Sequence, residues 1–348
     1  MKKSVVLVML GVLLLCVGQS VKANCADFVE ADLTYEVGNL YMPQDARVGS
    51  TIGIRKYTRS RWINCSVLVP FTFAGHIYGA KVPSTPTAVG AGTVDNLYAT
   101  SIPGVSVVVD YSSGPSYFCN TGTGAVFPVT FESCGSGATL AEVAVTLYLI
   151  KTGVIPAGTH DLNGLQIYGI EFDFGSGPER WVTGVLNGSV TVAGCSLPQE
   201  VGNNIDVPMG TWERRTFDGP GTFTATQNFV ITLSNCVAGT YPTGQAWNFF
   251  ASNYANIRLE GVRGSTIIDA SKGILSLNED SDAAGVAVQV LKMDGSPLPL
   301  GVDTPLMLVQ DGVTSLQLGA RYIQTAGSSI GPQPGVANAT ANFTITYK

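Results

Sequence analysis

The last twelve residues of the chain, 337 to 348, alternate strictly between apolar and polar side chains. A period of two is typical of a strand with one buried face. Thr and Asn fill the polar positions, so such a strand is nearly uncharged and prone to pair along its open edge. The pattern predicts a terminal strand that either closes a sandwich or borders a site for another strand. Its apolar positions are Ala337, Ala339, Ala341, Phe343, Ile345 and Tyr347.

The rest of the chain consists of short β-forming runs between Gly- and Pro-bearing breaks, with no convincing helical stretch. Strands at this spacing favour sandwiches or barrels, so we predict an all-β fold. The predicted strands are 52–54, 67–69, 105–109, 143–150, 165–174, 182–192, 223–226, 229–233, 255–259, 274–277, 286–291 and 315–322.

Residues 1–23 have the pattern of a secretory signal. Lys2 and Lys3 precede the apolar run from Val5 to Val17, and Val21-Lys22-Ala23 provides a cleavage site. We therefore expect an exported protein whose mature chain starts at Asn24. Removal of this segment, which holds three Lys and no acid, lowers the formal net charge from −6 to −9.

The mature chain is long enough for two cores. The run Val190-Thr191-Val192 is typical of the last strand of one domain, and Cys195 opens a new unit. We predict a first domain at 24–192, a short linker at 193–194 and a second domain at 195–348.

Six Cys remain after the signal, an even number that favours disulfides in an exported protein. Six Cys allow fifteen connectivities. Sequence order suggests Cys25–Cys65, Cys119–Cys134 and Cys195–Cys236, because this pairing keeps every bridge within one predicted domain.

Charge and motifs narrow the chemistry. An acidic chain does not favour nucleic acid as a partner. Neither His76 nor His160 lies in a nucleophile or zinc motif. Glu171 and Asp173 would share a strand face, where carboxylates serve glycoside hydrolysis, sugar binding or only solvation. The acidic run 279–282 lacks the ligand spacing of a calcium loop. We expect no enzyme, no metal and no cofactor; a secreted β-sandwich hydrolase is the weakest alternative.

The second half resembles the pilin domains of chaperone–usher pilus subunits. The resemblance rests on Cys195 and Cys236, the latter in Thr232-Leu233-Ser234-Asn235-Cys236, on the run 283–291, and on the alternating end with Tyr347 next to last. It implies an incomplete immunoglobulin-like domain that lacks its last strand, with a groove that a partner's strand fills. The residues expected to border this groove are Ala339, Ala341, Phe343, Ile345, Tyr347 and Lys348.

The first half is similar to the receptor-binding domain of type 3 fimbrial tip adhesins. The residues that carry this likeness are Cys25, the run 48–52, Cys65 and the run 97–105. It implies an elongated immunoglobulin-like, lectin-type sandwich. The pair Cys119 and Cys134 departs from the family pattern. Residues after Asn24 run straight into a Cys-tethered domain and offer no alternating extension, so we expect a tip position.

The resemblance implies a periplasmic chaperone, an outer-membrane usher and the next pilus subunit as partners, and a place at the extracellular fimbrium tip. We expect binding of a host glycan or, as an alternative, of a matrix protein such as collagen. A structural minor or tip pilin without a receptor is the rival function. Aromatic and charged side chains suit sugar recognition. On that ground the candidate receptor residues are Arg55, Tyr57, Arg61, Trp62, Asp173, Arg180 and Trp181.

Overall fold

The computed structural model describes residues 25–26, 30–65, 71–83, 88–89, 92–93, 95–113, 125–132, 139–175, 177–197, 204–241, 249–325 and 331–348. Of these, 25–26, 59–65, 88–89, 92–93, 112–113, 125 and 139–143 are described by their backbone alone. The predicted signal at 1–23 and the Cys119–Cys134 bridge lie outside the described residues, so both stay predictions.

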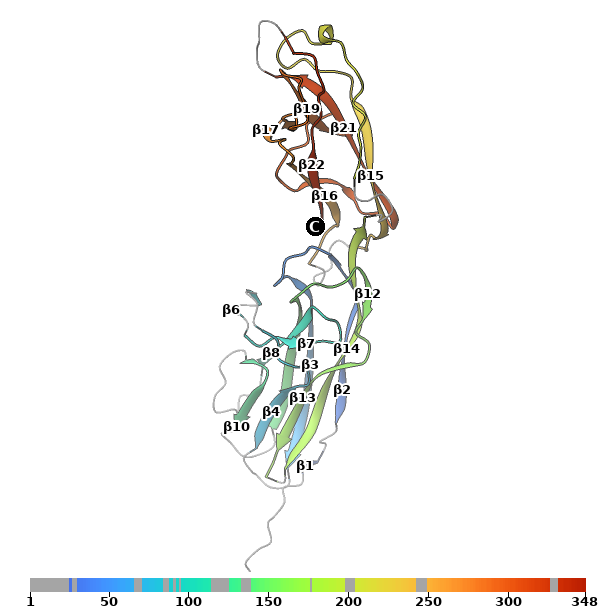
Figure 1. Ribbon diagram of the computed structural model, residues 1–348. Coiled ribbons are helices and arrows are strands. Elements are labelled where there is room, and N and C mark those ends of the chain that lie inside the picture. The colour runs from blue at the N-terminus through green and yellow to red at the C-terminus, as the bar shows by residue number, and fades with distance from the viewer. Residues whose placement is uncertain are drawn as a thin grey trace, which may run out of the picture.

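The described parts of the chain are almost entirely β, which confirms the predicted fold class. Two elongated units follow one another along the molecule (Figure 1). The exception to the strands is a short 3₁₀ turn, η3 (Arg214–Thr216). No helix among the described residues is long and apolar enough to cross a membrane.

The first unit is built from two sheets. In one sheet the order is β1 (Cys25–Ala26), β3 (Thr51–Cys65), β11 (Thr139–Lys151), β8 (Val105–Ser113) and β7 (Tyr98–Ala99), and β9 (Ala125–Val126) pairs with β8. In the other the order is β10 (Val129–Glu132), β4 (Thr72–Ile77), β13 (Leu165–Asp173) and β14 (Pro178–Ser196). β14 also pairs with β12 (Gly158–Asp161) and, in parallel, with β2 (Ala31–Pro43). A small hairpin joins β5 (Ala88–Val89) and β6 (Gly92–Thr93).

The core of this unit lies between the two sheets and is rich in aromatic rings. Phe73, Phe172 and Trp181 are buried together, and the hydroxyls of Tyr35 and Tyr168 are 2.6 Å apart inside it. A buried hydroxyl needs such a partner, because leaving it without one costs about 1–3 kcal/mol. The pair therefore ties β2 to β13 through the centre of the core.

The second unit has its own core between two sheets. One sheet continues from the end of β14 through β15 (Gln227–Val237), β21 (Gly312–Gln324), β19 (Val286–Lys292), β18 (Ile274–Leu275) and β17 (Ile267–Asp269). The other contains β20 (Thr304–Leu308), β16 (Tyr254–Gly261) and β22 (Ala341–Tyr347) in that order.

The predicted linker is not a separate segment. Ala193 and Gly194 lie inside β14, which runs without interruption from the first unit into the second and pairs there with β15. The reason is local: the sequence from Val190 to Cys195 has strand formers but no Pro or turn pair, so nothing ends the strand. The division into domains at 192 and 195 stays a prediction, with two separate hydrophobic cores in its favour.

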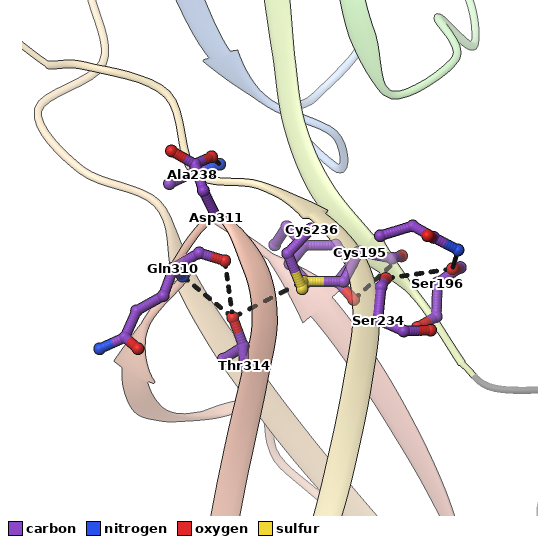
Figure 2. The surroundings of a disulfide bond; sticks show 10 residues. Cys195, Ser196, Ser234, Cys236, Ala238, Gln310, Asp311 and Thr314 are labelled. Atoms are coloured by element: carbon purple, nitrogen blue, oxygen red, sulfur yellow. Dashed lines mark hydrogen bonds between the residues drawn. A yellow bond between two sulfur atoms is a disulfide. The ribbon is translucent and has the colours of Figure 1, made fainter.

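The predicted bridge between Cys195 and Cys236 is confirmed. Figure 2 shows it at the junction of β14 and β15, where Ser196 and Ser234 also bond to each other's backbone carbonyls. Cys25 and Cys65 are register partners in β1 and β3, but their side chains are outside the described residues. That bridge therefore stays a prediction.

Loss of the confirmed bridge should destabilise the second unit. The bond closes a separation of 41 residues, and a loop of that order restricts the unfolded chain enough to contribute about 2–4 kcal/mol. The double change Cys195→Ala and Cys236→Ala should lower the melting temperature of the mature chain, measured by calorimetry. Adding a reductant should destabilise the second unit of the native protein but not that of the variant. A variant that melts at the same temperature as the native protein would contradict the expectation.

Candidate functional site

The terminal strand β22 presents one apolar face to the second core, as its alternation predicts. Ala341, Phe343 and Ile345 pack against that core but are only half-buried, whereas Asn342 and Thr344 between them are exposed. Fully burying an apolar side chain of the size of Phe or Ile stabilises by about 1.5–3 kcal/mol. These three side chains therefore leave apolar area that a further strand could cover.

The backbone of β22 is open along one edge. In the described part of the chain, β22 pairs with β16 alone. β15, on the opposite sheet, pairs with β21 over its whole length but with β14 only near Gly194 and Ser196. Phe229 of β15 is also half-buried against the same core. The second unit thus has a partly covered core flanked by an unpaired strand edge, which is the geometry of an acceptor for an added strand. We call the open edge of β22, with Ala341, Phe343 and Ile345, the acceptor edge.

The ends of the predicted groove differ from its middle. Ala339 is half-buried but precedes β22. Tyr347 is buried, and its hydroxyl donates to the carbonyl oxygen of Cys195 at 3.2 Å. Burial raises the pKa of Tyr347 to about 12, so the hydroxyl keeps its proton at neutral pH. Lys348 forms an exposed ion pair with Asp303. Tyr347 is therefore a buried anchor of the terminal strand, and its side chain does not line the acceptor edge.

Two of the predicted receptor residues are used inside the fold. The Arg55 guanidinium donates to the backbone carbonyls of Glu36 and Val37 at 2.8 and 3.2 Å, which joins β3 to β2. Partial burial lowers its pKa. Asp173 accepts hydrogen bonds from the amides of Gly175 and Gly177 at 2.7 and 3.1 Å, so it shapes the turn between β13 and β14.

Trp181 contradicts the idea of an exposed stacking platform. Its side chain is 0% exposed and meets Phe172 edge-on, with ring centroids 5.3 Å apart. An indole without an accessible face cannot stack on a receptor, so its role is packing. The sequence alone did not distinguish a packing role from a stacking role, because an aromatic ring beside Arg is compatible with core and surface alike.

Two predicted residues keep an exposed position. The Tyr57 ring is 41% exposed and lies 5.9 Å from the Tyr35 ring, between centroids. Arg180 is 40% exposed at its side chain. Arg61 and Trp62 belong to β3, where Trp62 is the register partner of Leu140, but their side chains lie outside the described residues.

The structure gathers a cluster of charged and aromatic side chains around Arg180 that the sequence did not predict as a unit. The Glu171 carboxylate lies 3.1 Å from His76 Nε2 and 3.4 Å from Arg180 Nη2. The Arg180 guanidinium also stands over the Tyr78 ring, 5.6 Å from its centroid. These four residues, from β4, β13, β14 and the residue after β4, form what we call the Tyr78 cluster.

The Tyr78 cluster borders a cavity. Tyr78 is 41% exposed and lines a hollow of about 260 Å³, together with Gly79, Ala80, Ala99, Thr100, Ser101, Val107, Leu165, Gln166 and Ile167. The site thus combines an aromatic ring, a cation, a carboxylate and small polar groups. The sequence signal for His76 and Tyr78 is their spacing of two residues, which places them on the same side of an extended chain.

The described residues contain no group of three or more His, Cys, Asp or Glu arranged to hold a metal ion. The Glu171 carboxylate is engaged by His76 and Arg180, and the Asp173 carboxylate by two amides. The arrangement is suited to binding.

Comparisons with known proteins agree that the chain is similar to fimbrial proteins. A family model described as fimbrial protein matches residues 185–348. A fimbria adhesin protein of Klebsiella pneumoniae is 26% identical over 331 residues, which covers 91% of this chain and 91% of that protein. A type-1 fimbrial protein subunit of Serratia marcescens is 26% identical over 170 residues, which covers 47% of this chain and 84% of that protein.

Among solved structures, the receptor-binding domain of the plasmid-borne adhesin MrkD1P of Klebsiella pneumoniae matches 51% of this chain and 100% of its own, with 16% identity and a TM-score of 0.36. The CupB6 tip adhesin of Pseudomonas aeruginosa matches 88% of this chain and 90% of its own, with 18% identity and a TM-score of 0.36. TM-scores of this size are too low to carry an argument. The family match and the relative along nearly the whole chain do carry one: residues 185–348 form a domain of the fimbrial protein family, and the chain as a whole is a relative of fimbrial adhesins.

Proposed function

We propose that this protein is the tip adhesin of a chaperone–usher fimbria. It would be exported through the periplasm, where a chaperone lends a strand to the acceptor edge, and pass through an outer-membrane usher. The next subunit's extension would then replace the chaperone strand. The observation that carries this proposal is the open edge of β22 beside half-buried Phe343 and Ile345. An uncovered edge of this kind is a pairing hazard for an isolated protein and an asset for one that assembles by strand addition.

We further propose that the first unit binds a receptor through the Tyr78 cluster, and that the receptor is a glycan. Sugars offer apolar C–H faces to an aromatic ring and hydroxyls to charged partners. The Tyr78 ring and the exposed edge of Arg180 provide one of each, beside a hollow lined by Ser101 and Gln166. A matrix protein such as collagen is the second candidate, and a tip pilin without a receptor the third.

A glycan array tests this proposal on the mature chain held in complex with its chaperone. Tyr78→Ala should weaken binding of any bound glycan by about 1–3 kcal/mol, roughly fivefold to more than a hundredfold. Tyr57→Ala is the matched control, because Tyr57 is equally exposed but lies on the opposite sheet.

Each other outcome of the array favours a different reading. If Tyr57→Ala abolishes binding and Tyr78→Ala does not, the surface of β3 around Tyr57 is the receptor site. A blank array with binding to immobilised collagen would favour the matrix protein. No binding to either would favour the structural pilin.

A further inference from the structure

The acceptor edge ends at a defined atom, the backbone nitrogen of Tyr347. In an antiparallel ladder, residues that bond to the neighbouring strand alternate with residues that do not. Lys348 and Tyr254 exchange both backbone hydrogen bonds, at 2.7 and 3.1 Å. The alternation therefore turns the amides and carbonyls of Tyr347, Ile345 and Phe343 away from β16 and towards the open edge.

A carboxylate from the first unit already occupies the last of these positions. Asp45, in the turn between β2 and β3, accepts a hydrogen bond from the Tyr347 amide, with 2.9 Å from nitrogen to Oδ2. We infer that Asp45 closes the acceptor edge at Tyr347, so that an added strand pairs with positions up to Ile345 and no further. This inference rests on the proposed strand addition and names the residue that would set its limit.

The turn that carries Asp45 is held at both sides, which fixes the position of the carboxylate. The backbone amide of Gln44 donates to the carbonyl of Ala193 in β14 at 2.8 Å. The backbone of Lys151 exchanges hydrogen bonds with Gly49 and Ser50 at 2.7 and 2.9 Å. The ammonium of Lys151, itself 5% exposed, donates to the carbonyl of Gln44 at 2.5 Å. Both ends of the turn are thereby fixed to strands of the first unit.

The other partner of the contact is equally fixed. The Tyr347 side chain is buried and its hydroxyl bonds to Cys195, whose disulfide joins β14 to β15. Rotating Tyr347 to free its amide would break that bond as well. The Lys151 ammonium also attracts the Asp45 carboxylate and so helps to hold it in place. Burial lowers the pKa of Lys151, and the negative charge of Asp45 acts against that lowering. A strand that tried to pair at Tyr347 would have to displace a charged acceptor that is already in place.

Two synthetic strands with apolar residues at alternate positions test the inference on the mature chain. One is long enough to reach Ile345, and the other is extended by two residues to reach Tyr347. With the native chain the extension should add no affinity. With Asp45→Ala it should tighten binding several-fold. Asp311→Ala is the matched control, because Asp311 also accepts a backbone amide, that of Ala238 at 2.8 Å, but lies off the β22 edge.

Hydrogen exchange gives an independent readout. With the short strand bound, Asp45→Ala should speed exchange of the Tyr347 amide about tenfold or more, since a hydrogen bond to a charged acceptor is lost. Equal gain from the extension in native and variant chains, or unchanged exchange at Tyr347, would overturn the inference. Failure of both strands to bind any variant would instead count against the proposed strand addition. Exchange at Tyr347 in the dilute bare chain would then still decide the role of Asp45.

Discussion

Replacing both Phe343 and Ile345 by Asp is expected to abolish chaperone capture and surface display. Both side chains are half-buried on the acceptor edge. A strand laid over them would have to bury two carboxylates without partners, at a cost of several kcal/mol for each charge. The measurement is co-purification of the mature chain with its chaperone, followed by antibody labelling of intact cells. Complete loss of both signals is the expected result.

Thr344→Asp is the control for this prediction. Thr344 lies between the two on the same strand but faces solvent on the opposite side. The same charge placed there should leave capture and display at native levels. Capture of the double variant at the native level would show that the apolar face of β22 is not where a strand is added.

The same geometry sets the behaviour of the bare chain. Each apolar side chain that a donor strand would finish burying is worth up to about 1.5–3 kcal/mol, and the open edge invites pairing between molecules. Without a strand the second unit should melt early or aggregate, and a donor-strand peptide should raise its melting temperature. A soluble, monomeric bare chain with no response to the peptide would mean that the fold is complete by itself.

The alternation at the end of the chain predicted the apolar face of β22 but not where the strand begins. The strand was expected from Ala337, yet it starts at Ala341. Before that point the backbone bonds to loops: the carbonyl of Asn338 accepts from the Asn278 amide at 2.7 Å, and the Thr340 amide donates to the Ser265 hydroxyl at 3.0 Å. Partners so distant in sequence are not visible in a local pattern.

The long strand β2 was missed although its sequence carries a signal. Leu33, Tyr35 and Val37 alternate with exposed residues and are all buried. β2 pairs in parallel with β14, and neither a turn nor the spacing of residues in the sequence indicates this pairing. The opposite error occurred at 223–226, where a strand was predicted but Phe223 makes only an isolated bridge with Ile323. The strand predicted at 67–69 lies outside the described residues and stays a prediction.

Candidate site residues were harder to predict than strands, because residue type does not determine which side of a sheet a residue faces. Arg55 and Trp181 have the chemistry of a receptor site, but one bonds backbone carbonyls and the other fills a core. His76 and Tyr78 were not selected, since neither belongs to a motif. Only the register of β4 against β13, with His76 opposite Gly169, brings them to Glu171 and Arg180.

Trp181→Ala is therefore expected to act on stability. Removing a fully buried aromatic side chain leaves a cavity and costs about 3–5 kcal/mol. The ring is 0% exposed and contacts Phe172, so the loss should appear in the first unit as faster hydrogen exchange of the amides of β13 and β14. Trp181→Phe should cost less, because a ring is retained. Trp212→Ala is the second control: its indole donates to the Met209 carbonyl in the second unit at 2.7 Å, so β13 should not respond. A change below about 1 kcal/mol in Trp181→Ala, with receptor binding lost, would return Trp181 to the binding surface that its sequence neighbours first suggested.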